Sequence, residues 1–134
     1  MTSAEPSGKI SILVMDDVHA VRVQIKELLK SCGLENVKTV ANGAEAQTLL
    51  MTNEYQMVIA DWQTTPVDGM ELLGFIRGQE KLKSLAFFML TAESTKLKVL
   101  EATEAGIDGY IVKPLTADTI RTKIYTVLLK KQVM

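Results

Sequence analysis

The sequence has one cysteine, one histidine and no long apolar run, and each scarcity excludes a class of protein. Cys32 has no partner in the chain, so a disulfide framework is excluded and a reducing compartment fits. Nothing approaches the roughly 18 consecutive apolar residues that a membrane helix needs. The first residues lack the basic and apolar segments of a signal peptide. We therefore expect a soluble, cytoplasmic protein.

An excess of charge of one sign is also missing. The 134 residues include 15 lysines and arginines against 16 aspartates and glutamates, which gives a formal net charge of −1. No overall field favours nucleic acid or an anionic membrane, so we expect neither as a partner. Hydrophobic residues at 47% and charged residues at 23% are ordinary for a globular protein and exclude disorder. The length predicts one domain, which we expect to be monomeric.

Short apolar runs alternate with patterns of helical spacing along the whole chain. The runs are nearly continuous, which is typical of parallel strands that are buried on both faces. They cover Ile10–Met15, Val37–Val40, Gln56–Ala60, Ala86–Leu90 and Gly109–Val112. The order predicts a single α/β sandwich with right-handed crossovers over residues 9–134, preceded by a flexible tail over residues 1–8.

The helical segments carry their own start and stop signals. Apolar residues share one helix face in the stretch 21–32 and again in 120–128. Asn42 followed by Glu45 is typical of a helix N-cap. Gly33 and Gly106 are expected to end helices.

Reactive side chains follow four of the five predicted strands. Asp16 and Asp17 come after the first strand, Asp61 after the third, Thr91 after the fourth and Lys113 after the fifth. Taken singly, a helix cap or a solvated loop residue is the commoner explanation for each. Ligands bind beyond the carboxyl ends of parallel strands, however, and all of these residues meet at that edge.

The chemistry of such a cluster points to a cation and a phosphoryl group. Three carboxylates a few ångström apart repel one another, and Mg²⁺, which prefers oxygen ligands, removes the conflict. The ammonium of Lys113 suits a phosphoryl oxygen. A carboxylate held ionised there can act as a nucleophile toward phosphorus, and Asp61 is the natural choice.

The ordered set of motifs resembles the receiver domain of two-component response regulators, and among these the stand-alone receivers of chemotaxis. The similarity runs from about Lys9 to the final helix. The matching segments are Val14–Asp17, Asp61–Trp62, Asp68–Leu73, Thr91–Glu93, Ala105–Tyr110 and Lys113–Pro114. The resemblance implies a doubly wound, flavodoxin-like (βα)5 three-layer sandwich with the parallel sheet order 2-1-3-4-5.

By this resemblance, a histidine kinase phosphorylates Asp61. Asp17, Asp61 and the backbone carbonyl of Gln63 ligate Mg²⁺, for which Mn²⁺ can substitute, and Asp16 acts through water. Lys113 bonds the phosphoryl group and precedes a cis peptide bond to Pro114. The activity is self-phosphotransfer and self-dephosphorylation only, so the protein is not otherwise an enzyme.

The same resemblance assigns the output side of the molecule. Thr91 and Tyr110 form a switch pair, in which the tyrosine ring turns inward as Thr91 moves toward the phosphoryl group. Gln63 and Glu93 border the water that attacks the acyl phosphate. Output is expected through a partner surface, and a phosphatase is a further expected partner. That surface includes Lys96, Tyr110 and Arg121.

The sequence departs from the family pattern just after the predicted acceptor. The stretch Gln63–Pro66 carries its proline one place late, so we expect an altered turn and an intact site. Gln63 is longer than the asparagine found in related receivers, which predicts a changed dephosphorylation rate. Trp62 is expected to be a partly exposed packing residue, and His19 an exposed residue in the first turn of a helix.

We interpret the chain as a stand-alone response regulator that signals by binding a protein, with a flagellar motor switch protein as the favoured target. We expect no output module after the last predicted helix. A phosphorelay receiver that feeds another kinase or phosphotransfer protein is the alternative. A hydrolase built on an aspartyl phosphate would carry Asp-x-Asp after the first strand, and a flavin binder a glycine-rich phosphate loop. A receiver fold without phosphorylation is disfavoured by the complete acidic set.

Overall fold

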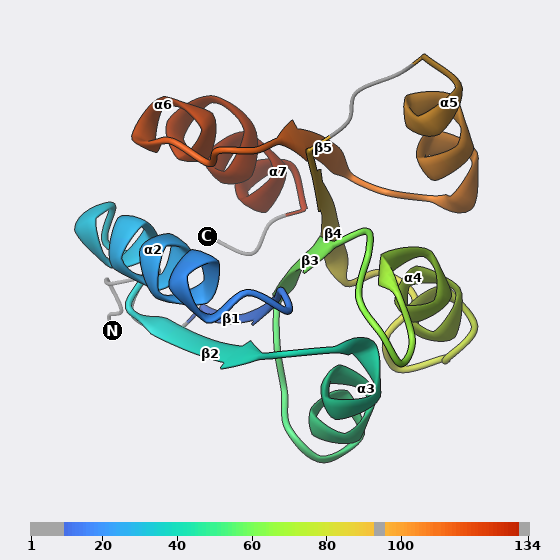
Figure 1. Ribbon diagram of the computed structural model, residues 1–134. Helices are drawn as coiled ribbons and strands as arrows, with labels where there is room; N and C mark the ends of the chain where they lie inside the picture. The colour runs from blue at the N-terminus through green and yellow to red at the C-terminus, as the bar shows by residue number, and fades with distance from the viewer. Residues whose placement is uncertain (1–9, 93–95, 132–134) are drawn as a thin grey trace.

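The computed structural model describes residues 10–92 and 96–131, and these form a five-stranded sheet between two layers of helices (Figure 1). All neighbouring strands are parallel, in the order β2-β1-β3-β4-β5. The strands are β1 (Ser11–Met15), β2 (Asn36–Val40), β3 (Met57–Asp61), β4 (Ala86–Thr91) and β5 (Gly109–Val112). The predicted fold class and strand order are therefore confirmed.

Helices cover both faces of the sheet. The helical segments are α2 (His19–Ser31), α3 (Gly43–Thr52), α4 (Gly69–Arg77), α5 (Lys96–Ala105), α6 (Ala117–Thr119), a π-helical turn (Ile120–Ile124) and α7 (Tyr125–Lys130). Helix α2 and the last helical segments pack on one face, where Leu29, Ile124 and Leu128 are buried. Helices α3, α4 and α5 pack on the other face (Figure 1). No helix in residues 10–92 or 96–131 is long and apolar enough to cross a membrane.

The predicted strands are correct to within one residue at each end. The third strand extends one residue further than expected because Asp61 pairs with Leu90, and the fourth extends to Thr91 because Thr91 pairs with Val112 of β5. β3 and β4 are buried along their whole length, as continuous apolar runs predict. Asp61 is thus the last residue of a buried central strand.

The helix boundaries also follow the predicted signals. Asn42 Oδ1 accepts a hydrogen bond from the Glu45 backbone N–H at 3.0 Å, as an N-cap requires. Gly33 and Gly106 have φ of 90° and 103°, the left-handed conformation in which a glycine ends a helix. One difference is the last predicted helix, which contains the π-helical turn between α6 and α7.

The altered loop after Asp61 packs against the start of α3. The Thr65–Pro66 peptide is cis, and Val67 has a φ of 67°. Thr64 Oγ1 donates to the Val67 carbonyl at 2.9 Å, and the Gly43 backbone N–H donates to the same oxygen at 3.0 Å. A Cβ on Gly43 would lie 2.4 Å from that oxygen, so only glycine fits there. The loop is therefore fixed by α3.

A second polar network lies near the opposite end of the sheet, at the start of β4 and β5. Arg77 donates to the Gly106 carbonyl at 3.0 Å and to Asp108 Oδ2 at 3.1 Å. The same Asp108 oxygen accepts from the Phe87 backbone N–H at 2.8 Å. Lys131 Nζ pairs with Asp108 Oδ1 at 3.3 Å. One partly buried carboxylate thus ties α4, β4 and the end of α7 together.

Candidate functional site

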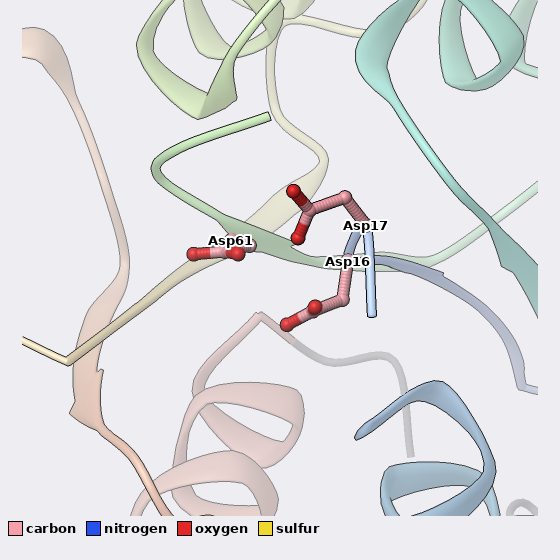
Figure 2. A group of neighbouring side chains, drawn as sticks. All are labelled: Asp16, Asp17 and Asp61. Carbon is pink, nitrogen blue, oxygen red and sulfur yellow. The ribbon is translucent and has the colours of Figure 1, made fainter. Parts of the chain in front are cut away.

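Three carboxylates gather at the carboxyl ends of β1 and β3, as the sequence predicts (Figure 2). Asp16 and Asp17 follow β1, and Asp61 ends the neighbouring strand β3. One oxygen from each lies within 4.8 Å of those of the other two. Asp16 is fully buried and Asp61 is 7% exposed, whereas Asp17 is exposed. The cluster therefore has a buried floor and one side open to solvent.

Three residues hold Asp16, two of them at its carboxylate and one at its backbone carbonyl. Its Oδ1 accepts from the Val18 backbone N–H at 2.9 Å, and its Oδ2 lies 2.9 Å from Lys113 Nζ. Among the described residues Oδ2 has no hydrogen-bond partner beyond this ion pair. Arg22, from α2, donates to the Asp16 backbone carbonyl at 2.6 Å. These contacts fix the loop that also carries Asp17. Arg22 was not predicted, because nothing in the sequence marks it beyond its place in the first turn of the helix that follows the Asp-Asp pair.

Lys113 bridges the two buried acids. Its Nζ lies 3.4 Å from Asp61 Oδ2 as well as 2.9 Å from Asp16. Its backbone N–H donates to the Thr91 carbonyl at 2.8 Å, which fixes the residue after β5, and the Lys113–Pro114 peptide is cis as expected. Burial lowers the pKa of Lys113, but its hydrogen bond to Asp16 and the charges of both acids outweigh burial and raise it. The ammonium therefore stays charged.

The pKa of Asp61 is raised, in a cluster that holds more negative charge than its one lysine can neutralise. Burial raises the pKa of Asp61, and the charge of Asp16 raises it further. Lys113 and the Gln63 backbone N–H, which donates to Asp61 Oδ1 at 3.4 Å, lower the pKa but do not cancel the rise. One ammonium cannot balance three carboxylates. A proton or a further cation at this place relieves the repulsion.

A depression of about 410 Å³ gives access to the cluster. Its lining brings together most of the predicted site: Asp17, Asp61, Gln63, Thr91, Ala92 and Lys113. Thr91 is the last residue of β4 and is 7% exposed. The donor set suits Mg²⁺, because Asp17 and Asp61 line a depression open to solvent, in which a metal could keep several waters. The altered loop leaves this site intact, as expected.

Tyr110 and Arg121 do not line the depression. Tyr110, on β5, is half-buried against the core on the α3–α5 face. Its backbone carbonyl accepts from Lys123 Nζ at 2.9 Å. Arg121 is exposed and pairs with Asp118. Glu93 lies outside the described residues, as does the side chain of Lys96, so their predicted roles stay predictions.

The expectation for Trp62 was wrong. The side chain is only 6% exposed and belongs to the core on the α3–α5 face. Its ring lies 4.5 Å from Lys98 Nζ of α5. The backbone N–H of Trp62 still donates to the Leu90 carbonyl at 3.0 Å, so the chain stays beside β4 and the ring packs into the core on that face. His19 is exposed at the start of α2, as expected.

Comparison with known proteins agrees with this geometry. The response regulator receiver domain family matches residues 12–125. Chemotaxis protein CheY-3 of Vibrio cholerae is 37% identical over 115 residues, which cover 86% of this chain and 88% of that protein. Chemotaxis protein CheY of Pseudomonas aeruginosa is 36% identical over 115 residues, 86% of this chain and 93% of that protein.

Solved structures agree as well. The chemotaxis response regulator CheY4 of Vibrio cholerae superposes with a TM-score of 0.81 at 28% identity, covering 89% of this chain and 98% of that chain. A sheet of order 2-1-3-4-5 with an acidic cluster and a lysine at its carboxyl edge defines a class of signalling domain. The chain belongs to the response regulator receiver domain family. Within that family, it is similar to CheY proteins of chemotaxis.

Proposed function

We propose that the chain is a stand-alone response regulator that accepts a phosphoryl group on Asp61 from a histidine kinase and signals by binding a protein. The observation that carries the proposal is the setting of Asp61. It ends the central strand beside two further carboxylates, and its Oδ2 lies 3.4 Å from the ammonium of Lys113. A divalent cation and an anionic phosphoryl group together satisfy this arrangement of charges.

Each residue has a definite part in the transfer. Asp17, Asp61 and the Gln63 carbonyl would hold Mg²⁺, which supplies positive charge to the phosphoryl oxygens when bound. An Asp61 carboxylate oxygen attacks phosphorus, an O–P bond forms, and the N–P bond to the kinase imidazole breaks. The electron pair of that bond stays on the imidazole nitrogen. Lys113 then pairs with a phosphoryl oxygen in place of the Asp61 carboxylate.

The proposal includes a role for Thr91 in reading the modification. Thr91 lines the same depression as Asp61, which supports a role in which its hydroxyl would donate to a newly bound phosphoryl oxygen. Thr91 and Tyr110 would then change together as a two-state packing element. Beyond self-phosphotransfer and self-dephosphorylation we propose no enzymatic activity. The lone cysteine supports a reducing compartment, and we place the protein in the cytoplasm.

The partner is proposed from the relatives. Two relatives at 36–37% identity are named chemotaxis proteins, and the chain aligns over most of their length. A flagellar motor switch protein is therefore the favoured target. Capture of partners by the phosphorylated protein tests this choice. Retention of a phosphotransfer protein or a kinase in place of a motor protein would support a phosphorelay instead.

The central experiment is metal-dependent phosphorylation by acetyl phosphate. The protein is incubated with this donor in Mg²⁺ or in chelator, and its intact mass is measured. We expect one added phosphoryl group in Mg²⁺ only, and none on an Asp61→Asn variant. Asp118→Asn, which changes an exposed acid paired with Arg121, is the matched control and should behave as wild type. A wild-type protein that gains no mass in Mg²⁺ would refute the proposal.

A further inference from the structure

Helix α5 is the least firmly seated of the longer helices. Of its residues with described side chains, only Ala102 is buried. Leu97 is 79% exposed and Leu100 is 52% exposed. Figure 1 places the helix at the edge of the molecule. A helix with so few buried contacts opens locally at low cost, so each remaining contact has a large influence on its position.

One of those contacts reaches the residue next to the proposed acceptor. Lys98 Nζ lies 4.5 Å from the ring centroid of Trp62, within the range of a cation–π interaction. Both side chains are at least partly removed from solvent, since Trp62 is 6% exposed and Lys98 half-buried. Removal from water strengthens such a contact. Helix α5 is therefore attached near its start to Trp62.

Trp62 in turn is fixed to the acidic site. It follows Asp61 directly, and its backbone N–H donates to the Leu90 carbonyl at 3.0 Å. Its own carbonyl accepts from the Gly69 backbone N–H at 2.9 Å, at the start of α4. The next backbone N–H, that of Gln63, donates to the Asp61 carboxylate. A rearrangement of the Asp61 carboxylate around a cation or a phosphoryl group therefore moves the Trp62–Gln63 peptide, and with it the Trp62 side chain.

We propose that Lys98 is a positioning residue that couples helix α5 to the acidic site through the Trp62 ring. The inference rests on the proposed function, since it assumes that a cation and a phosphoryl group bind at Asp61. Binding of the cation or the phosphoryl group changes the contact between the Trp62 ring and the Lys98 ammonium. This change alters how readily α5 opens locally. If cation binding changes the affinity for a protein that holds α5 in place, linkage requires that this protein change the affinity of the site for the cation by the same factor.

The test measures amide hydrogen exchange of α5 in chelator, in Mg²⁺, and in Mg²⁺ with acetyl phosphate. Lys98→Met keeps the aliphatic stem and removes the charge, whereas Lys98→Arg keeps a cation that can stack on the ring. Glu101→Gln changes an exposed charge on the same helix and is the control. Because Trp62 is the only tryptophan, its emission reports directly on the contact in every variant.

We expect Lys98→Met to raise exchange in α5 about fivefold in chelator, shift the Trp62 emission, and lose most of the exchange response to loading. Lys98→Arg should restore the wild-type response, and Glu101→Gln should retain it. The inference is overturned if Lys98→Met matches wild type in emission, in exchange and in the response to loading.

Intact mass separates this outcome from failure of the proposed function. A Lys98→Met variant that takes up the phosphoryl group as wild type does, yet shows the lost α5 response, supports the inference. A wild-type protein that gains neither metal nor phosphoryl group refutes the proposed function and with it the coupling, whatever the emission in chelator shows.

Discussion

Replacing Asp61 with asparagine should stabilise the metal-free protein at neutral pH. The variant keeps the shape of the side chain and the acceptor for the Gln63 N–H, and it removes a charge that is nearly buried. Lys113 keeps its closer partner, Asp16, at 2.9 Å. The variant therefore removes repulsion without leaving the ammonium unpaired.

The magnitude follows from the distances. At 4.8 Å, the largest separation of the ligand oxygens, each of the other two acids repels Asp61 by about 3.5 kcal/mol at an effective dielectric constant of about 20. Lys113 at 3.4 Å attracts Asp61 by about 5 kcal/mol on the same basis. The repulsions exceed the attraction by about 2 kcal/mol. Because Asp17 is exposed and screened, we expect a gain of about 1–2 kcal/mol in the free energy of unfolding.

The dependence on pH gives a second readout of the same effect. The pKa of Asp61 is raised in the folded protein, so its ionisation costs stability as pH rises from its ordinary value of 3.8 through the folded value. The advantage of Asp61→Asn should therefore be present at pH 7 and vanish below 3.8, where the acid is protonated in both states.

The assay is urea unfolding in chelator and in Mg²⁺. At a metal concentration about 100 times the dissociation constant, wild type should gain about 2.7 kcal/mol and the variant much less, so the order of stability reverses. Asp118→Asn, which removes an exposed charge paired with Arg121, should differ from wild type by less than about 0.5 kcal/mol in both conditions. The reasoning is refuted if Asp61→Asn is no more stable than wild type in chelator at pH 7.

Three further predictions concern other residues. Asp108→Asn should lower the free energy of unfolding by about 2–4 kcal/mol in urea titrations, because Arg77 and Lys131 both lose their carboxylate partner. Gly43→Ala should cost about 1–3 kcal/mol, because the new methyl group meets Val67, whereas Gly74→Ala meets nothing within 4 Å and should gain about 0.5–1 kcal/mol. Gln63→Asn should change the rate of phosphate release in a time course, because Gln63 lines the depression beside Asp61, and equal rates would contradict this role.

The sequence predicts the sheet well because each strand is buried on both faces. A continuous apolar run such as that of β3 fits a strand covered on both faces. The ends of the run therefore mark the ends of the strand to within one residue. The gathering of Asp16, Asp61 and Lys113 follows in turn, because parallel strands end at a common edge. The position of these three residues could therefore be predicted without knowledge of side-chain contacts.

Contacts between helices and loops could not be predicted in the same way. The buried position of Trp62 depends on where α4 and α5 lie, and Lys98 carries no pattern that distinguishes it from a solvated surface lysine. The left-handed backbone conformation of Val67 could not be predicted from the sequence either, since a β-branched residue disfavours that conformation. It is held there by hydrogen bonds from Thr64 and Gly43, which are far apart in sequence.

The single histidine offers a second spectroscopic view of the acid loop. His19 Nδ1 lies 3.4 Å from Arg22, and the same guanidinium donates to the Asp16 carbonyl. A protein with one imidazole gives one set of ring signals in a proton spectrum. A shift of those signals on cation addition would follow the β1 side of the site, and the indole emission would follow the β3 side. The response of each half of the cluster to cation can thus be measured separately in unlabelled protein.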